Sequence, residues 1–212
     1  MKPLSAVSAK KVSIVVKLMQ KMLMFLLSIL KSKPLYKFLR TDLKSDYDQS
    51  QWKIGIWRKT KCTELCAGFN CSEKIIDAFN YVKGEVLAQV KTRGKHFVDT
   101  NKQTWEEMCI VKVWDWTKTD NVRLSIFAAE QLLAVFEKKY PTDKMPRQAI
   151  DTAKEWLKNP TTNANYALAN ANYAAYAAST SVYAVADADS IKEECENFIK
   201  KLLEEKEAKN EN

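Results

Sequence analysis

The sequence has few of the residues that mark catalytic sites. Its 212 residues include one histidine, His96, and no serine or cysteine stands in a nucleophile-type turn, so no nucleophile–base pair is indicated. We expect His96 to lie in a solvent-facing loop. Glu106 and Glu107 are adjacent, and on a strand they would point to opposite faces rather than form a carboxylate pair. The sequence therefore favours binding over catalysis and predicts no cofactor.

Cysteine is present, but its pattern is not typical of disulfides or of a metal site. The number is odd, and no convincing secretion signal is found, which argues against a disulfide framework and for a reducing, intracellular setting. The spacings of three and four residues in the first cluster differ from the two that paired zinc ligands typically have. We expect reduced cysteines that act as small apolar side chains, and no metal. The five cysteines are Cys62, Cys66, Cys71, Cys109 and Cys195.

Acidic residues are absent from the first 40 positions, which hold nine of the 34 lysines and arginines. The remaining positions carry 25 basic and 26 acidic side chains, a net charge of −1, although the whole chain has +8. The basic character therefore belongs to an N-terminal segment, residues 1–38. A specific nucleic-acid-binding face on the folded body is disfavoured.

The N-terminal segment also lacks a hydrophobic run long enough to cross a membrane unaided. Its uncharged run, Met22–Leu30, has nine residues, whereas a spanning helix needs about 20. Between Val12 and Leu30 the polar residues fall along one side of a helix, which predicts an amphipathic helix. Packing on the body or on another copy is favoured. Binding of residues 10–33 to an anionic membrane surface, or a span with unusual help, stays open.

Residues 39–117 have the pattern of a small α+β domain. Apolar spacing predicts a helix at Lys74–Val82, capped by Ser72 and ended by Gly84. Alternation and β-branched or aromatic residues predict three strands, at Trp52–Trp57, Glu85–Thr92 and Met108–Trp116.

A small-ligand or nucleotide site, with or without catalysis, is an alternative function for this domain. Tryptophan, arginine and glutamate side chains could line its pocket. A deep cavity with convergent polar groups would favour this alternative, and a filled core would favour protein binding. The candidate pocket residues are Trp52, Trp57, Arg93 and Glu106.

Residues 118–212 predict a helical domain. Thr119 or Asp120 can cap a first helix that stops near Tyr140, and Pro146 suits the first turn of a second helix, which Asn159-Pro160 ends. The short connection predicts an antiparallel pair. Apolar residues at three- and four-residue steps mark the buried faces. They are Val122, Ile126, Ala129, Leu132, Leu133 and Phe136, then Ala149, Ile150, Ala153, Trp156 and Leu157.

Four heptads follow at 163–190, with alanines that let another backbone approach closely. The tyrosine seam of these heptads has two interpretations: the core of the domain, which is favoured, or a surface for a protein partner, where tyrosine is enriched. The seam consists of Tyr166, Tyr173, Tyr176 and Tyr183.

A last helix is predicted at 191–206, and its charged end, 204–212, is expected to fray. Ser190 with Glu193 has the pattern of a capping box at its start. Its apolar stripe consists of Ile191, Cys195, Phe198, Ile199 and Leu202.

The turn between the first two helices contains the most specific run of the chain. Residues 136–150 read Phe-Glu-Lys-Lys-Tyr-Pro-Thr-Asp-Lys-Met-Pro-Arg-Gln-Ala-Ile. Asp143 and Arg147 are four residues apart at a helix start, where an ion pair that fixes the turn is favoured. The alternative is that Arg147 and the loop 141–146 bind a ligand or partner.

This run resembles the signature Phe-Glu-x-x-x-Pro-x-Asp-x-x-Pro-Arg-x-Ala-Ile of a family of helical immunity-protein domains. The resemblance covers about residues 120–205, including the alanine-rich tract. Met145 stands where the family has a basic residue. The resemblance implies a helical fold and protection against a toxin.

A second resemblance concerns about residues 39–117. The run Cys-Ala-Gly-Phe-Asn-Cys-Ser-Glu at 66–73 precedes the predicted helix, and Leu-Ala-Gln-Val stands at 87–90. These runs resemble a phage- and prophage-encoded domain of unknown function with a Gly-Phe-His-Ala core. Asn70 stands at the position of the histidine.

The sequence thus predicts an α+β protein: an N-terminal amphipathic helix (1–38), a small α+β domain (39–117) and a helical immunity-like domain (118–212). The favoured function is non-enzymatic binding of another protein, as a phage-type accessory protein. We expect it in the cytoplasm of a bacterial host, at a membrane periphery or in a virion. The sequence leaves the oligomeric state open.

Overall fold

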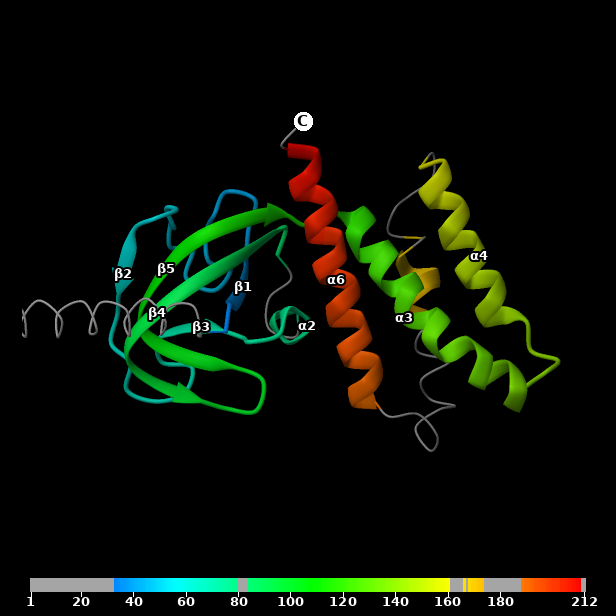
Figure 1. Ribbon diagram of the computed structural model, residues 1–212, viewed down its shortest axis with the longest axis horizontal. Helices are drawn as coiled ribbons and strands as arrows, with labels where there is room; N and C mark the ends of the chain where they lie inside the picture. The colour runs from blue at the N-terminus through cyan, green and yellow to red at the C-terminus, as the bar shows by residue number, and fades with distance from the viewer. Residues whose placement is uncertain (1–32, 80–83, 161–165, 167, 174–187, 211–212) are drawn as a thin grey trace, which may run out of the picture. The chain divides into compact units, whose positions relative to one another are not determined.

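The computed structural model describes residues 33–79, 84–160, 166, 168–173 and 188–210. The chain forms two compact units, Met1–Pro34 and Leu35–Asn212. The predicted N-terminal amphipathic helix lies almost wholly outside the described residues. The second unit is α+β, as predicted, with an antiparallel sheet and helices packed beside it (Figure 1).

The centre of the sheet is a long hairpin of β4 (Val86–Val98) and β5 (Gln103–Asp115). The strands predicted at Glu85–Thr92 and Met108–Trp116 are confirmed, and both continue toward the hairpin turn. The alternation of the sequence breaks because the register shifts near Gly94, whose φ is +86°. Glycine adopts this left-handed conformation at little steric cost.

Three short strands complete the sheet, which has the order β1-β4-β5-β2. β1 (Leu35–Leu39) pairs with β4, whereas β2 (Trp57–Lys59) and β3 (Phe69–Cys71) pair with different parts of β5. β1 lies at the end of the range 1–38 that the sequence assigns to the N-terminal helix. Both of its faces are buried, so it lacks the alternation of a half-exposed strand.

The strand predicted at Trp52–Trp57 is wrong except for its last residue, which begins β2. The chain turns at Gly55, whose φ is +80°, and the amide of Ile56 donates to the carbonyl of Lys53 at 3.3 Å. A positive φ at this position breaks the extended conformation that the β-branched residues suggest.

The helix predicted at Lys74–Val82 is described only in its first part, α2 (Ile75–Ala78). Ser72 does not cap it, because its backbone pairs with β1 instead. The acceptor comes from elsewhere in the chain: the amide of Ile76 donates to the carboxylate of Glu196 at 3.0 Å. A long-range contact therefore replaces the local cap.

The antiparallel helix pair is confirmed as α3 (Lys118–Lys139) and α4 (Met145–Lys158), with the predicted ends and buried faces. The predicted cap of α3 is wrong. Thr117 is the N-cap, and it forms a capping box with Asp120, the third residue of the helix. Thr119 is exposed and takes no part in the cap.

Arg147 fixes the turn between α3 and α4, but not through Asp143 as predicted. Its Nε and Nη2 bind the two carboxylate oxygens of Glu137 at 2.5 and 2.6 Å. Asp143 accepts a hydrogen bond from the amide of Met145 instead, at 2.9 Å. The antiparallel packing of the two helices brings Glu137 beside Arg147, although ten residues separate them in sequence.

The last helix, α6 (Ala188–Asn210), is longer than predicted at both ends. It begins before Ser190, so the predicted capping box with Glu193 is wrong; Glu193 binds Lys74 at 2.8 Å. The predicted fraying is also wrong as far as Asn210. Ion pairs hold the last turns: Glu205–Arg123 at 3.0 Å, Lys206–Asp120 at 2.9 Å and Glu207–Lys112 at 2.6 Å.

α6 lies between the sheet and α3 (Figure 1). On its other side, Phe198 stacks on Phe127 of α3 with ring centroids 4.3 Å apart. The ranges 39–117 and 118–212 therefore share one core within the second unit. That core contains Ile199, Leu202 and Leu203 of α6 together with Tyr36, Phe38, Ile75, Leu87, Trp114 and Trp116.

We predict that Thr117→Ala lowers the free energy of unfolding by about 1 kcal/mol, because the amide of Asp120 loses its capping acceptor. Urea denaturation followed by circular dichroism measures the change. Thr119→Ala is the matched control, since it removes the same atoms two residues away, and it should change stability by less than about 0.5 kcal/mol. Equal losses in the two variants would contradict the assignment of the cap.

Candidate functional site

Trp52, the first of the predicted pocket residues, is core. Its side chain is 1% exposed and packs with Met108 and Ile110 on one face of the sheet. The indole N–H donates to Ser45 Oγ at 2.8 Å. A filled core around this ring leaves it no role as the wall of an open pocket.

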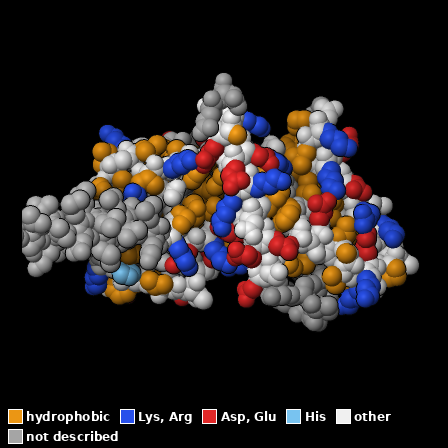
Figure 2. Space-filling model, in the orientation of Figure 1, with side chains coloured by type: hydrophobic (Ala, Val, Ile, Leu, Met, Phe, Trp, Pro, Cys, Tyr) orange, Lys and Arg blue, Asp and Glu red, His pale blue; other side chains and the backbone are white. Residues whose placement is uncertain are grey.

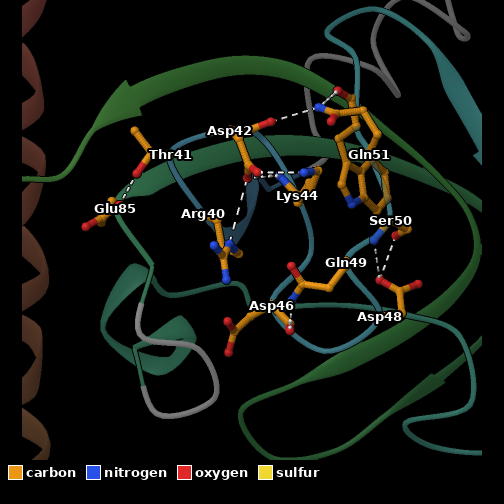
Figure 3. A network of polar contacts seen from close by, with 11 residues as sticks. Arg40, Thr41, Asp42, Lys44, Asp46, Asp48, Gln49, Ser50, Gln51 and Glu85 are labelled. Atoms are coloured by element: carbon orange, nitrogen blue, oxygen red, sulfur yellow. Dashed lines mark hydrogen bonds and ion pairs between the residues drawn. The ribbon is translucent and has the colours of Figure 1, made fainter.

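The segment 40–51, which covers this face, is held together by side chain–backbone hydrogen bonds (Figure 3). Asp48 accepts from the amide of Ser50 at 3.1 Å and from its hydroxyl at 2.7 Å, and the hydroxyl bond is the main cause of a lowered pKa of Asp48. Gln51 Nε2 donates to the carbonyl of Asp42 at 2.8 Å. These bonds give an irregular segment a defined shape over the buried indole.

Two cations lie over the Trp52 ring. The Nζ of Lys37 and the guanidinium of Arg58 are 4.6 and 4.4 Å from its centroid. Arg58 is also fixed by Ser50 Oγ at 3.0 Å. Burial lowers the pKa of Lys37 to about 8, with the nearby Cys71 thiol opposing this change and Arg58 adding to it. The surroundings of Lys37 therefore disfavour its charged form.

A second group of charges surrounds Trp57 on the sheet. The guanidinium of Arg93 lies 4.1 Å from the Trp57 ring, and its Nε is 2.6 Å from Glu107. Lys59 binds Glu106 at 3.1 Å and Glu107 at 3.4 Å. The two adjacent glutamates, expected to point apart, thus reach one ammonium group.

Trp57, Arg93 and Glu106 lie in this group, and Trp52 does not. Trp57 and Arg93 share the face of Cys109 and Glu107, whereas Trp52 packs with Met108 on the other face. Glu106 alternates with Glu107 and joins the group through Lys59, whose Nζ lies 3.1 Å from its carboxylate. The amide of Lys95 is the main cause of a lowered pKa of Glu106, and Arg93 of that of Glu107. Both carboxylates are ionised and paired at neutral pH, which suits a surface ion cluster rather than acid–base chemistry.

Asn70, which stands where the resembled phage domain has a histidine, has a structural contact. It accepts a hydrogen bond from the hydroxyl of the fully buried Thr104 at 2.6 Å. The same hydroxyl accepts from the amide of Cys66 at 2.9 Å. These bonds tie the loop before β3 to β5.

The cysteines and the histidine do not gather into a common site among the described residues. Cys62, Cys71, Cys109 and Cys195 are buried and Cys66 is exposed; burial raises the pKa of Cys71 to about 12 and that of Cys195 to about 11. Among the described residues no group of three potential metal ligands occurs. His96 lies on β4 rather than in a loop, and its exposed ring stacks on Trp105 at 4.1 Å.

The described part of the tyrosine seam faces outward. Tyr166 is 62% and Tyr173 46% exposed, so the core interpretation is wrong for these two residues. Ala171 is buried and Leu168 partly buried against α3 and α4. Tyr176 and Tyr183 lie outside the described residues. Arg147, the other partner-binding candidate, is engaged by Glu137.

The helical surface carries both signs of charge. On the face seen in Figure 2, basic and acidic side chains are interspersed over the helices. Cross-helix ion pairs account for part of this mixture, among them Arg123–Glu205 and Lys154–Glu130. This agrees with the small net charge of the chain beyond its first 40 residues.

No family model, curated protein or solved structure matches the chain. The two resemblances noted in the sequence therefore rest on the residues that carry them. Among the described residues, no helix is both long and apolar enough to cross a membrane.

We predict that Lys37→Met raises the free energy of unfolding near pH 7, because the folded protein then no longer holds an ammonium whose pKa is lowered from 10.5 to about 8. Between about pH 8 and pH 10.5, Lys37 has lost its proton in the folded wild type but retains it in the unfolded chain. The wild type therefore gains stability as the pH rises through this range. The advantage of the variant, on the order of 2 kcal/mol, should therefore shrink toward pH 10.

Urea denaturation of both proteins near pH 7 and near pH 10 measures this difference. Lys91→Met, at an exposed position of β4, is the control and should show little change at either pH. A stability difference between Lys37→Met and wild type that does not depend on pH would contradict the role given to burial.

We predict that Gly94→Ala destabilises the protein more than Gly55→Ala. Both glycines have a positive φ, +86° and +80°, so each alanine adds roughly 1 kcal/mol of backbone strain. A Cβ at position 94 would also lie 2.7 Å from Glu106 Oε2, whereas nothing lies within 4 Å of one at position 55. Thermal unfolding of the two variants compares the costs. Equal losses would show that Glu106 moves aside freely.

Proposed function

We propose that this chain is a non-enzymatic accessory protein of a phage or prophage that binds another protein through its helical surface. The immunity-like signature supports binding of a toxin as the specific role. Its free, mostly buried cysteines are compatible with the reducing cytoplasm of a bacterial host. The paired state of Glu106 and Glu107, and the filled core around Trp52, support binding over catalysis.

The outward orientation of Tyr166 and Tyr173 is the observation that carries the proposal. Seven residues apart, at about 100° per residue, the two side chains fall on one side of a helix. Leu168 and Ala171 fall on the opposite side, where they pack against α3 and α4. Asn172 adds a hydrogen bond, accepting from the hydroxyl of Ser125 at 2.8 Å.

The segment is thus anchored through Leu168 and Ala171 and exposes its two tyrosines. Exposed tyrosine is suited to protein recognition, because its rigid ring buries a large area with little loss of side-chain entropy and its hydroxyl can still form a hydrogen bond. Tyrosine is also among the residues that contribute most to binding energy at interfaces. A solvent-facing tyrosine pair on a fixed support therefore suits contact with a partner.

We predict that Tyr166→Ser with Tyr173→Ser weakens partner binding at least about tenfold, since truncation of a central interface tyrosine costs more than about 1 kcal/mol. The partner is first identified by affinity purification of the intact chain from its host and mass spectrometry. Isothermal titration calorimetry with the purified partner then measures the dissociation constant.

Tyr47→Ser is the matched control, because Tyr47 is fully exposed in the segment 40–51, away from the helices. It should leave binding unchanged, and both variants should keep the unfolding temperature of the wild type. Unchanged binding by the double variant would reject the tyrosine surface. Recovery of no specific protein, together with turnover of a nucleotide, would reject the proposed function.

A further inference from the structure

Among the described strands, β2 is an edge strand with no neighbour on its outer side. The amide of Thr60 donates to the carbonyl of Glu106 at 2.9 Å, so Thr60 and Arg58 direct their backbone groups toward β5. Trp57 and Lys59 alternate with these residues and therefore direct their N–H and C=O groups away from the sheet. Within the described part of the chain, no hydrogen bond reaches these outward N–H and C=O groups. They are available to pair with a further strand.

Large apolar side chains lie beside this open edge. Ile54 is 50%, Ile56 56% and Trp57 37% exposed. The turn at Gly55 places the two isoleucines next to the start of β2, and the amide of Gly55 is bonded to Ile110 of β5 at 2.8 Å. Backbone pairing groups and apolar side chains thus occur together on one edge, which is the combination used by strand-addition sites.

The charge of the edge is positive. Residues 52–62 contain Lys53, Arg58, Lys59 and Lys61 and no acidic residue. The carboxylates of Glu106 and Glu107 are already engaged by Lys59 and Arg93. Lys53 and Lys61 are exposed, and no ion pair joins either to another described residue. An approaching segment therefore meets uncompensated positive charge.

We propose that the β2 edge binds an extended segment of another protein, with alternating apolar and acidic residues, which adds to the sheet as a strand. The backbone of the segment pairs with Trp57 and Lys59, its apolar side chains cover Ile54 and Ile56, and its carboxylates bind the neighbouring lysines. The inference is independent of the proposed function, because it uses the sheet rather than the helical surface.

Other occupants fit the edge less well. A second copy of the chain, paired edge to edge, would place Lys59 and its neighbouring lysines against the same positive charges. Single-stranded nucleic acid needs exposed rings for base stacking; Ile54 and Ile56 have none, and the guanidinium of Arg93 already lies over the Trp57 ring at 4.1 Å. An acidic peptide meets both the apolar and the charged features.

The test selects peptides of about ten residues, a long strand length, from a random displayed library on the full chain. Counter-selection uses Ile54→Ser with Ile56→Ser, both at exposed positions. We expect enrichment of peptides with net negative charge and alternating apolar residues, and at least about tenfold weaker binding to the variant by fluorescence anisotropy. Hydrogen exchange should slow at the amides of Trp57 and Lys59 when such a peptide binds.

Val98→Ser with Met145→Ser is the control variant, because these residues are 63% and 57% exposed elsewhere on the chain. It should bind the selected peptides as tightly as the wild type does. The proposal is overturned if the selected peptides bind both variants equally, lack acidic residues, or leave the two amides unprotected. It is also overturned if the edge variant instead abolishes binding to an oligonucleotide or self-association in sedimentation.

Discussion

The packing of α6 against the sheet is the interaction on which the rest of this unit depends. The buried carboxylate of Glu196 accepts a hydrogen bond from the amide of Ile76. It thereby gives α2 the capping acceptor that the residues before the helix do not supply. Ile199 and Leu202 of the same helix belong to one buried cluster with Phe38 and Trp116. An acidic group that is 1% exposed is tolerable only when its oxygens are bonded, so removal of α6 would expose apolar surface and leave α2 without a cap.

The same helix connects two kinds of structure. One side of α6 packs on the sheet, and its Phe198 contacts Phe127 of α3. The sheet can therefore present its β2 edge, and the helices their exposed tyrosines, from one body. The two proposed surfaces lie on different elements, so one molecule with both would hold two partners at a high effective concentration relative to each other.

The sequence predicts those features that depend on neighbours in the chain. The buried faces of α3 and α4 follow from apolar spacing, because Ile150 and Ala153 lie on the same helical face whatever they pack against. Long-range pairings could not be found in this way. Glu137 replaces Asp143 as the partner of Arg147, and β1 has no alternation because both its faces are buried. Of the predicted pocket residues, Trp57, Arg93 and Glu106 lie in one charged group, whereas Trp52 is buried beside Met108 in the core, a tertiary contact that local sequence does not reveal.

Tyr36 and Leu202 pack in the same core, and this has a consequence for synthesis of the protein. These residues come from the first strand and the last helix of the described chain, so the sheet cannot bury its apolar face until nearly every intervening residue has been translated. The nascent hairpin therefore emerges with an uncovered surface, which is open to chaperones or to misassociation. Formation of contacts so distant in sequence also slows folding, and the late arrival of α6 completes the process.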